Sequence, residues 1–293
     1  MSSPRFRNHR FFSVLWLAAL LIGVQLGCAS FKSNEEKETK AALIPAPGKY
    51  SLRLSQYVFY ADFPLKDHSG MFQELAELHD QVFNELQLPP STAIVQVFLF
   101  EDQARYEKYM RNRYPDLPRR RAFFISQPRS SRGTEDLLVF TYWGDNITED
   151  LRHELTHALL HSSLHEVPLW LDEGLAEYFE LPPANHGLNS SHLEQLRRGP
   201  FTPDLARMEQ LNQVQQMERA EYREAWAWVH YLMQSKPDRK KVLLDYLQEL
   251  RTPQRSATSM MSRLRELTPT VNDELRDHLA GLDENKVGDA SKP

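Results

Sequence analysis

Residues 151–180 read LRHELTHALLHSSLHEVPLWLDEGLAEYFE, and this stretch decides the expected fold. Its first half predicts a helix, because apolar residues recur at helical spacing at Leu151, Leu155, Ala158 and Leu159. His153 and His157 are four residues apart, so both imidazoles project from one face of that helix and can bind one cation. Either Asn146 or Thr148 is available to cap the helix start.

Glu154 lies beside the two imidazoles, one position along the helix. From there its carboxylate can reach a water bound to the metal, which is where a general base for hydrolysis must stand. A catalytic zinc uses three protein ligands and keeps a fourth position open, so a third ligand must come from elsewhere in the chain. The alternative interpretation is a chance His-Glu-x-x-His pattern on an ordinary helix.

A second pattern follows Pro168, where residues 170–178 read WLDEGLAEY. Together the two patterns resemble the gluzincin metallopeptidases, whose third zinc ligand is the Glu of an Asn-Glu-Ala or Trp-Leu-Asn-Glu-Gly-Phe-Ala sequence on the next helix. The resemblance implies that Glu173 is the third ligand and that Glu177, one turn later, orients His153. The segment between the two patterns is shorter than in thermolysin or the aminopeptidases. The chain resembles most the smaller, peptidase-MA-like gluzincins of bacterial secreted proteins and lipoproteins.

A third segment, residues 222–232, reads YREAWAWVHYL and is similar to the Tyr-x-x-Gly helix start of aminopeptidase-type gluzincins. In that family the tyrosine hydrogen-bonds the developing oxyanion, so the resemblance implies this role for Tyr222. Ala225 stands where that family has Gly. The alternative is an ordinary tyrosine at a helix start, facing solvent or the core.

Two further histidines, His161 and His165, continue the four-residue spacing. Four residues over three turns span about 18 Å, so they cannot all bind one ion, and His161 is expected at most at the edge of the site. A metzincin site would need Gly and His where Leu160 and Ser163 stand. These observations restrict the expected ligands to the set named above.

The charge of the chain argues against one class of partner, nucleic acids. The net charge is −5, and no long basic cluster is present, which argues against nucleic-acid binding. The short basic run over residues 119–121 is expected to be a solvated loop, with a substrate anchor as the alternative.

The first thirty residues predict export. Three arginines precede an apolar run over residues 11–26, the order typical of a secretory signal. Residues 26–30 read LGCAS and resemble the bacterial lipoprotein signal, which implies lipidation of Cys28, the only cysteine. Gln25 departs from the usual aliphatic residue, so ordinary signal-peptidase cleavage stays open. We expect a lipid-anchored protein of the bacterial cell envelope. An outer-membrane or periplasm-facing location is favoured because Ala29 replaces the Asp that retains many lipoproteins at the inner membrane.

The remaining pattern predicts an α+β fold, which the resemblance makes a zincin domain of gluzincin type with a small mixed sheet and active-site helices. Strands are expected at 57–63, 93–100, 122–126 and 137–143, with helices at 71–86 and 103–110 between the first three. An all-helical C-terminal subdomain follows, with helices at 189–198, 218–234, 240–250, 256–267 and 271–282. The expected organisation is a signal peptide (1–28), a tether (29–48), a zincin catalytic subdomain (49–182), a helical subdomain (183–283) and a flexible tail (284–293).

Zincins place an edge strand along the cleft, where an extended peptide adds as a further strand, and residues 137–143 are the candidate here. The chain lacks the Gly-Ala-Met-Glu-Asn sequence with which aminopeptidase-type relatives hold the substrate amine. We therefore expect a zinc-dependent endopeptidase with one Zn²⁺ per chain and a peptide or protein substrate. Three alternatives stay open: an inactive gluzincin fold that binds a partner or a cell-envelope polymer, a structural metal site, and hydrolysis of a non-peptide substrate.

Overall fold

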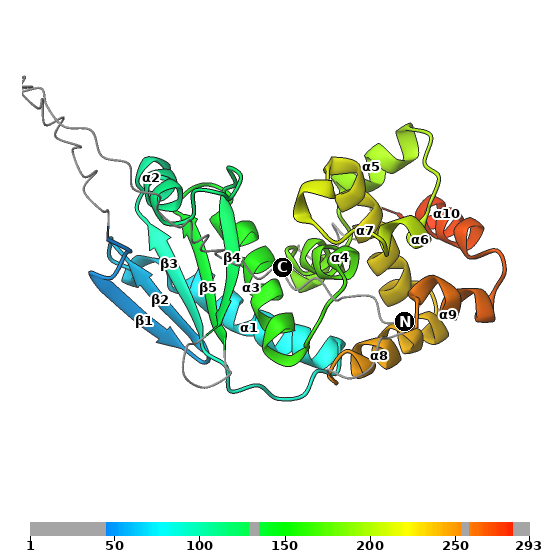
Figure 1. Cartoon of the computed structure of the whole chain (residues 1–293), viewed down its shortest axis with the longest axis horizontal. Coiled ribbons are helices and arrows are strands. Elements are labelled where there is room, and N and C mark those ends of the chain that lie inside the picture. Colours follow the sequence, from blue (N-terminus) through cyan, green and yellow to red (C-terminus); the bar gives the residue numbers. More distant parts are fainter. Residues whose placement is uncertain (1–44, 129–134, 253–257, 284–293) are drawn as a thin grey trace, which may run out of the picture. The chain divides into compact units, whose positions relative to one another are not determined.

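The computed structural model describes residues 45–128, 135–252 and 258–283. These residues all belong to one compact unit. They form an α+β structure with a five-stranded mixed sheet and ten α-helices (Figure 1). The expected signal peptide, Cys28, most of the tether and the C-terminal tail lie outside the described residues. Within the described ranges, no helix has the length and apolar character needed to cross a membrane.

The sheet combines parallel and antiparallel pairs. Its strands are β1 (Tyr50–Leu54), β2 (Tyr57–Ala61), β3 (Val95–Phe100), β4 (Ala122–Pro128) and β5 (Glu135–Tyr142), in the spatial order β1-β2-β3-β5-β4. Strands β2, β3 and β5 are parallel, whereas β1 and β4 run antiparallel to their neighbours. The prediction of an edge strand at 137–143 is therefore wrong. The chain reverses after β4, and β5 then pairs with β3, which leaves β4 at the edge.

Alternation along the central strands divides the core between the two faces of the sheet. On one face, Val95, Val97, Leu137 and Val139 join the main hydrophobic cluster with α1 (Ser69–Glu85) and α3 (Ile147–Ser163). On the other face, Phe100 and Phe140 pack with Tyr106 and Met110 of α2 (Gln103–Arg113). The helix that carries the His-Glu-x-x-His pattern is thus held against the sheet, where it also contacts the edge strand β4.

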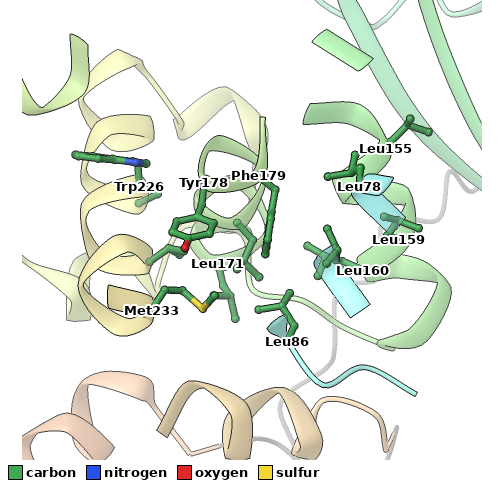
Figure 2. Packing of buried hydrophobic residues seen from close by; sticks show 14 of the residues in the cluster. Leu78, Leu86, Leu155, Leu159, Leu160, Leu171, Tyr178, Phe179, Trp226 and Met233 are labelled. Atoms are coloured by element: carbon green, nitrogen blue, oxygen red, sulfur yellow. The ribbon is translucent and has the colours of Figure 1, made fainter. Parts of the chain in front are cut away.

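Helix α4 (Leu169–Phe179) links the sheet side of the molecule to the later helices, because it packs against both α3 and α7 (Arg219–Gln234). Figure 2 shows the result: Leu155 and Leu159 of α3, Phe179 of α4 and Met233 of α7 belong to one cluster of buried side chains. The remaining helices are α5 (Ser190–Arg198), α6 (Leu205–Met208), α8 (Pro237–Glu249), α9 (Met260–Leu267) and α10 (Val271–Gly281). The hydrophobic core is therefore continuous across residue 182, where we expected one subdomain to end and the next to begin.

A buried arginine fixes α3 against the end of α4. The side chain of Arg152 is only 1% exposed, and its guanidinium donates hydrogen bonds to the backbone oxygens of Phe179, Glu180 and Leu181 and to the side chain of Gln81. These carbonyls lie at the C-terminal end of α4, where a helix leaves its last acceptors without partners. Because Arg152 directly precedes His153, this network fixes the helix that carries the His-Glu-x-x-His pattern relative to α4.

The contact between α4 and α7 depends on Gly174, which directly follows Glu173. A Cβ atom at this position would lie 2.6 Å from the backbone oxygen of Ala225 and 2.8 Å from Cγ2 of Val229. We expect Gly174→Ala to lower the free energy of unfolding by about 1–3 kcal/mol, because the two helices must separate. Urea denaturation measures this change. Gly70→Ala in α1 is the matched control, since its Cβ meets no atom within 4 Å, and it should raise the free energy of unfolding by about 0.4–1 kcal/mol. Equal stability of Gly174→Ala and the wild type would contradict the described packing.

Candidate metal centre

The structure brings the three predicted metal ligands together from two helices. Helix α3 carries His153 and His157, and α4 carries Glu173. Oε2 of Glu173 lies 3.6 Å from Nε2 of His153 and 3.6 Å from Nε2 of His157. One candidate ligand atom from each residue lies within 4.8 Å of the other two. Three donors thus surround one point.

The donor set fits a zinc ion. Tetrahedral zinc with bonds of about 2.1 Å separates neighbouring ligand atoms by about 3.4 Å, close to the 3.6 Å seen here. Oε2 of Glu173 is buried and has no hydrogen-bond partner among the described residues, although a buried carboxylate oxygen without a partner is unfavourable. Two imidazoles and one carboxylate form a common ligand set of catalytic zinc. His153, His157 and Glu173 would hold the ion.

A carboxylate lies behind each histidine. Nδ1 of His153 lies 3.0 Å from Oε2 of Glu180, and Nδ1 of His157 lies 2.9 Å from Oδ1 of Asp172. With a proton on Nδ1, the lone pair of Nε2 faces the common point, which is the tautomer that a metal requires. The other oxygen of Asp172, Oδ2, lies 3.0 Å from Nε2 of His161. His161 is therefore at the edge of the site, as expected.

The structure places Glu180, rather than Glu177, within hydrogen-bond distance of Nδ1 of His153. Oε2 of Glu177 instead lies 2.8 Å from Nε2 of His192 in α5. Helix geometry accounts for the difference. At about 100° per residue, Glu180, seven residues after Glu173, is rotated by only about 20° from the direction of Glu173. Glu177, four residues after Glu173, is rotated by about 40°. Glu177, Glu180 and His153 also form a second group whose ligand atoms lie within 4.8 Å of one another, but this group shares His153 with the first.

The candidate ligands shift one another's pKa values. Burial lowers the pKa of His157, but the facing carboxylates of Asp172 and Glu173 outweigh burial and raise it to about 10. Burial likewise opposes the charged form of His153, and Glu173 and Glu180 nevertheless raise its pKa well above the usual range. Burial raises the pKa of Glu173, yet the two imidazoles lower it to about 2. When no metal is bound, these shifts favour the protonated forms of both imidazoles and the ionised form of Glu173.

Zinc binding is expected to release about two protons per ion at pH 7, because a histidine must be neutral to bind metal. Since both pKa values are raised, the apparent zinc affinity should increase with pH from neutral toward pH 10. Titration calorimetry in two buffers with different ionisation enthalpies measures the number of protons. Zinc binding with no proton release, or affinity that falls as pH rises over this range, would contradict the described site.

Glu154 faces a cleft beside the three ligands. The cleft has a volume of about 530 Å³, and Glu154, His153, Arg120, Glu177 and His192 are among its lining residues. Burial raises the pKa of Glu154, while His153 and His157 oppose this change. A half-buried carboxylate with a raised pKa beside a candidate metal centre is suited to accept and return a proton.

Tyr222 reaches the site from the first turn of α7. Its hydroxyl lies 3.4 Å from Oε1 of Glu173 and accepts a hydrogen bond of 2.9 Å from Nη2 of Arg120. Burial raises the pKa of Tyr222 to about 12, so the phenol is protonated at neutral pH and able to donate. The structure places the hydroxyl of Tyr222 at the candidate metal centre, which favours a role in the site over an ordinary tyrosine at a helix start.

The basic run over residues 119–121 is only partly a solvated loop. Arg119 is exposed, as expected. Arg120 and Arg121, however, line the cleft, and Nη2 of Arg121 lies 2.7 Å from Oδ1 of Asp150 in α3. The same run leads into the edge strand β4, whose Phe124 ring lies 5.2 Å from the ring of His161. The edge strand therefore borders the candidate site.

Sequence patterns alone did not indicate three of these residues. Asp172 directly precedes Glu173 and Glu180 follows the last residue of α4, so a search for acidic residues one position before and seven after Glu173 would have found them. Arg120 meets Tyr222 across 102 positions of sequence, and no local pattern marks such a contact. His165 takes no part in the site, and its backbone N–H donates to the backbone oxygen of Leu250.

Residues 147–255 match a family described as "Protein of unknown function (DUF1570)". The matched segment begins at the first residue of α3 and extends past the end of α8. It includes the three candidate ligands, Glu154 and Tyr222, but neither Arg120 nor the sheet. No curated protein matches the chain. The match thus covers α3, α4 and α7, and the description of the matched family assigns no activity.

Proposed function

We propose that this protein is a zinc-dependent peptide hydrolase of gluzincin type that acts as an endopeptidase. One observation supports the proposal most strongly. Oε2 of Glu173 is buried without a hydrogen-bond partner among the described residues and lies 3.6 Å from both Nε2 atoms of the His-Glu-x-x-His helix. Glu154 of the same helix lines the adjoining cleft, so a base and a metal centre share one opening.

Bound zinc would supply a Lewis acid and a water of lowered pKa. Glu154 would take the proton of that water and later return it to the leaving amine, a role that its raised pKa favours. Tyr222, protonated at neutral pH, would donate a hydrogen bond to the oxyanion that forms on the substrate. Asp172 and Glu180 would keep the two imidazoles in the orientation described above.

The edge strand β4 is the proposed support for an extended peptide. Among the strands that the structure describes, β4 pairs only with β5, so its other edge offers backbone groups to a further strand. Its first residue, Ala122, lines the cleft together with Glu154. This replaces residues 137–143 in the expected role. The missing amine-binding sequence and the strand-like support both favour cleavage within a chain over removal of one terminal residue.

The proposed location is the bacterial cell envelope, with Cys28 as the lipid-anchored residue. The supporting observations are the basic and apolar pattern of residues 1–26 and the LGCAS sequence over residues 26–30. The proposed partners are a peptide or protein substrate and, through the anchor, a membrane surface; the net charge of −5 argues against nucleic acid.

The test is hydrolysis of a diverse peptide library by the compact unit, residues 42–293, with mass spectrometry of the products. We expect cleavage inside peptides by the zinc-loaded protein, loss of cleavage after chelation, and recovery when zinc is restored. A folded, zinc-loaded protein that cleaves no peptide would overturn the proposal and favour the inactive scaffold that binds a partner or polymer.

A further inference from the structure

Arg120 is held rigidly at the start of β4. The hydroxyl of Tyr106, a residue only 1% exposed, donates a hydrogen bond of 3.0 Å to the backbone oxygen of Arg120. The next carbonyl, of Arg121, accepts a hydrogen bond of 3.1 Å from the buried hydroxyl of Thr141. The backbone that presents Arg120 to the cleft is therefore fixed by two successive hydrogen bonds.

The guanidinium of Arg120 has Tyr222 as its hydrogen-bond partner. Nη2 donates to the hydroxyl over 2.9 Å, and the guanidinium carbon lies 5.9 Å from the centre of the Tyr222 ring. Within the part of the chain that the structure describes, no carboxylate forms an ion pair with Arg120, whereas its neighbour Arg121 pairs with Asp150. A cation without a carboxylate partner thus faces the cleft beside the candidate base, Glu154.

The hydrogen bond from Arg120 restricts the hydroxyl of Tyr222. Its oxygen accepts from the guanidinium, so its one proton must point elsewhere, and Oε1 of Glu173 lies on that side, 3.4 Å away. A hydrogen bond from a cation also polarises the O–H group and makes it a stronger donor. The proton of Tyr222 is therefore directed toward the candidate metal centre.

We infer that Arg120 is a positioning residue, which holds the hydroxyl of Tyr222 by its oxygen and directs its O–H toward the oxyanion of the substrate. The inference rests on the proposed function, because it assigns a role in the same reaction. Preorganised donors of this kind contribute strongly because they need no reorientation as charge develops. The competing role, an anchor for an acidic group of the substrate, predicts a different kinetic result.

The kinetic test compares Arg120→Gln, Tyr222→Phe, the double variant and the control Arg119→Gln on one peptide substrate. Arg120→Gln should lower kcat about tenfold and leave KM nearly unchanged, and Tyr222→Phe should lower kcat about 10²–10³-fold. The double variant should be no slower than Tyr222→Phe, because Arg120 acts through the hydroxyl. Arg119 is exposed and lies outside the cleft, so Arg119→Gln makes the same charge change and should leave kcat and KM unchanged. A raised KM with unchanged kcat, or additive losses in the double variant, would overturn the inference.

A second measurement does not depend on activity. With 3-fluorotyrosine incorporated at position 222, the fluorine resonance should shift in Arg120→Gln and stay in place in Arg119→Gln, with or without zinc. An unchanged resonance in folded Arg120→Gln would overturn the inference. If the wild type binds zinc but hydrolyses no peptide, the proposed function fails, and this spectrum still decides whether Arg120 fixes the hydroxyl.

Discussion

Glu154→Gln is expected to lower the rate of peptide hydrolysis by about 10²–10⁴-fold while zinc remains bound. Glutamine keeps the size and polarity of the side chain but cannot accept a proton. Glu154 points into the cleft and is not one of the three residues whose donor atoms converge. The loss should therefore fall on kcat, with zinc content and thermal stability close to those of the wild type.

The matched control for this variant is Glu149→Gln. Glu149 lies in the first turn of α3, lines the same cleft and is exposed, so it makes the same charge change on the same helix. We expect its kcat to stay within about threefold of the wild type, as is usual for exposed charges away from the reacting groups. Retention of full activity by Glu154→Gln would show that another group acts as the base.

Among the carboxylate variants around the site, Glu173→Ala is expected to cause the largest loss of zinc affinity. It removes one of three candidate ligands, and it leaves the buried imidazole of His157 and the partly buried imidazole of His153 facing an apolar methyl group. Loss of a partner that only orients a ligand costs about 10–100-fold in affinity, and loss of the ligand itself should cost more. Competition with a chromophoric chelator measures the dissociation constant for each variant.

A graded series separates the roles of the neighbouring carboxylates. Asp172→Asn, which weakens the partner of His157, should lose about 10–100-fold in zinc affinity. Glu194→Gln in α5 should bind zinc like the wild type, because Glu194 is exposed and pairs with Arg198. A smaller loss for Glu173→Ala than for Asp172→Asn would contradict the assignment of the third ligand.

Local spacing was enough to predict the elements around the site. The His-Glu-x-x-His helix and most later helices follow from apolar periodicity, and α7 occupies 219–234 where 218–234 was expected. Glu173 was predicted from a resemblance rather than from spacing, because the number of residues between two helices does not determine how the helices pack. Gly174 explains the packing after the fact, because only its missing side chain lets α4 approach Ala225.

Spatial order was not predictable in the same way. The order of the strands along the chain does not determine that β5 lies between β3 and β4 in the sheet, so the edge was assigned to the wrong strand. Strand β1 was missed because Tyr50–Leu54 follows a polar, Pro-containing segment and has no apolar run of its own. The contact of Arg120 with Tyr222 depends on how the fold places the residues just before β4 opposite the first turn of α7, which is a property of the whole fold.

Metal content of the compact unit, residues 42–293, tests the central claim most directly. The purified protein is saturated with zinc, dialysed against metal-free buffer at pH 8 and measured by plasma emission spectroscopy, beside His157→Ala and Glu173→Ala. The metal centre described here predicts one zinc per wild-type chain and little or none in either variant. Folded wild-type protein that retains no zinc, or variants that retain as much as the wild type, would contradict it.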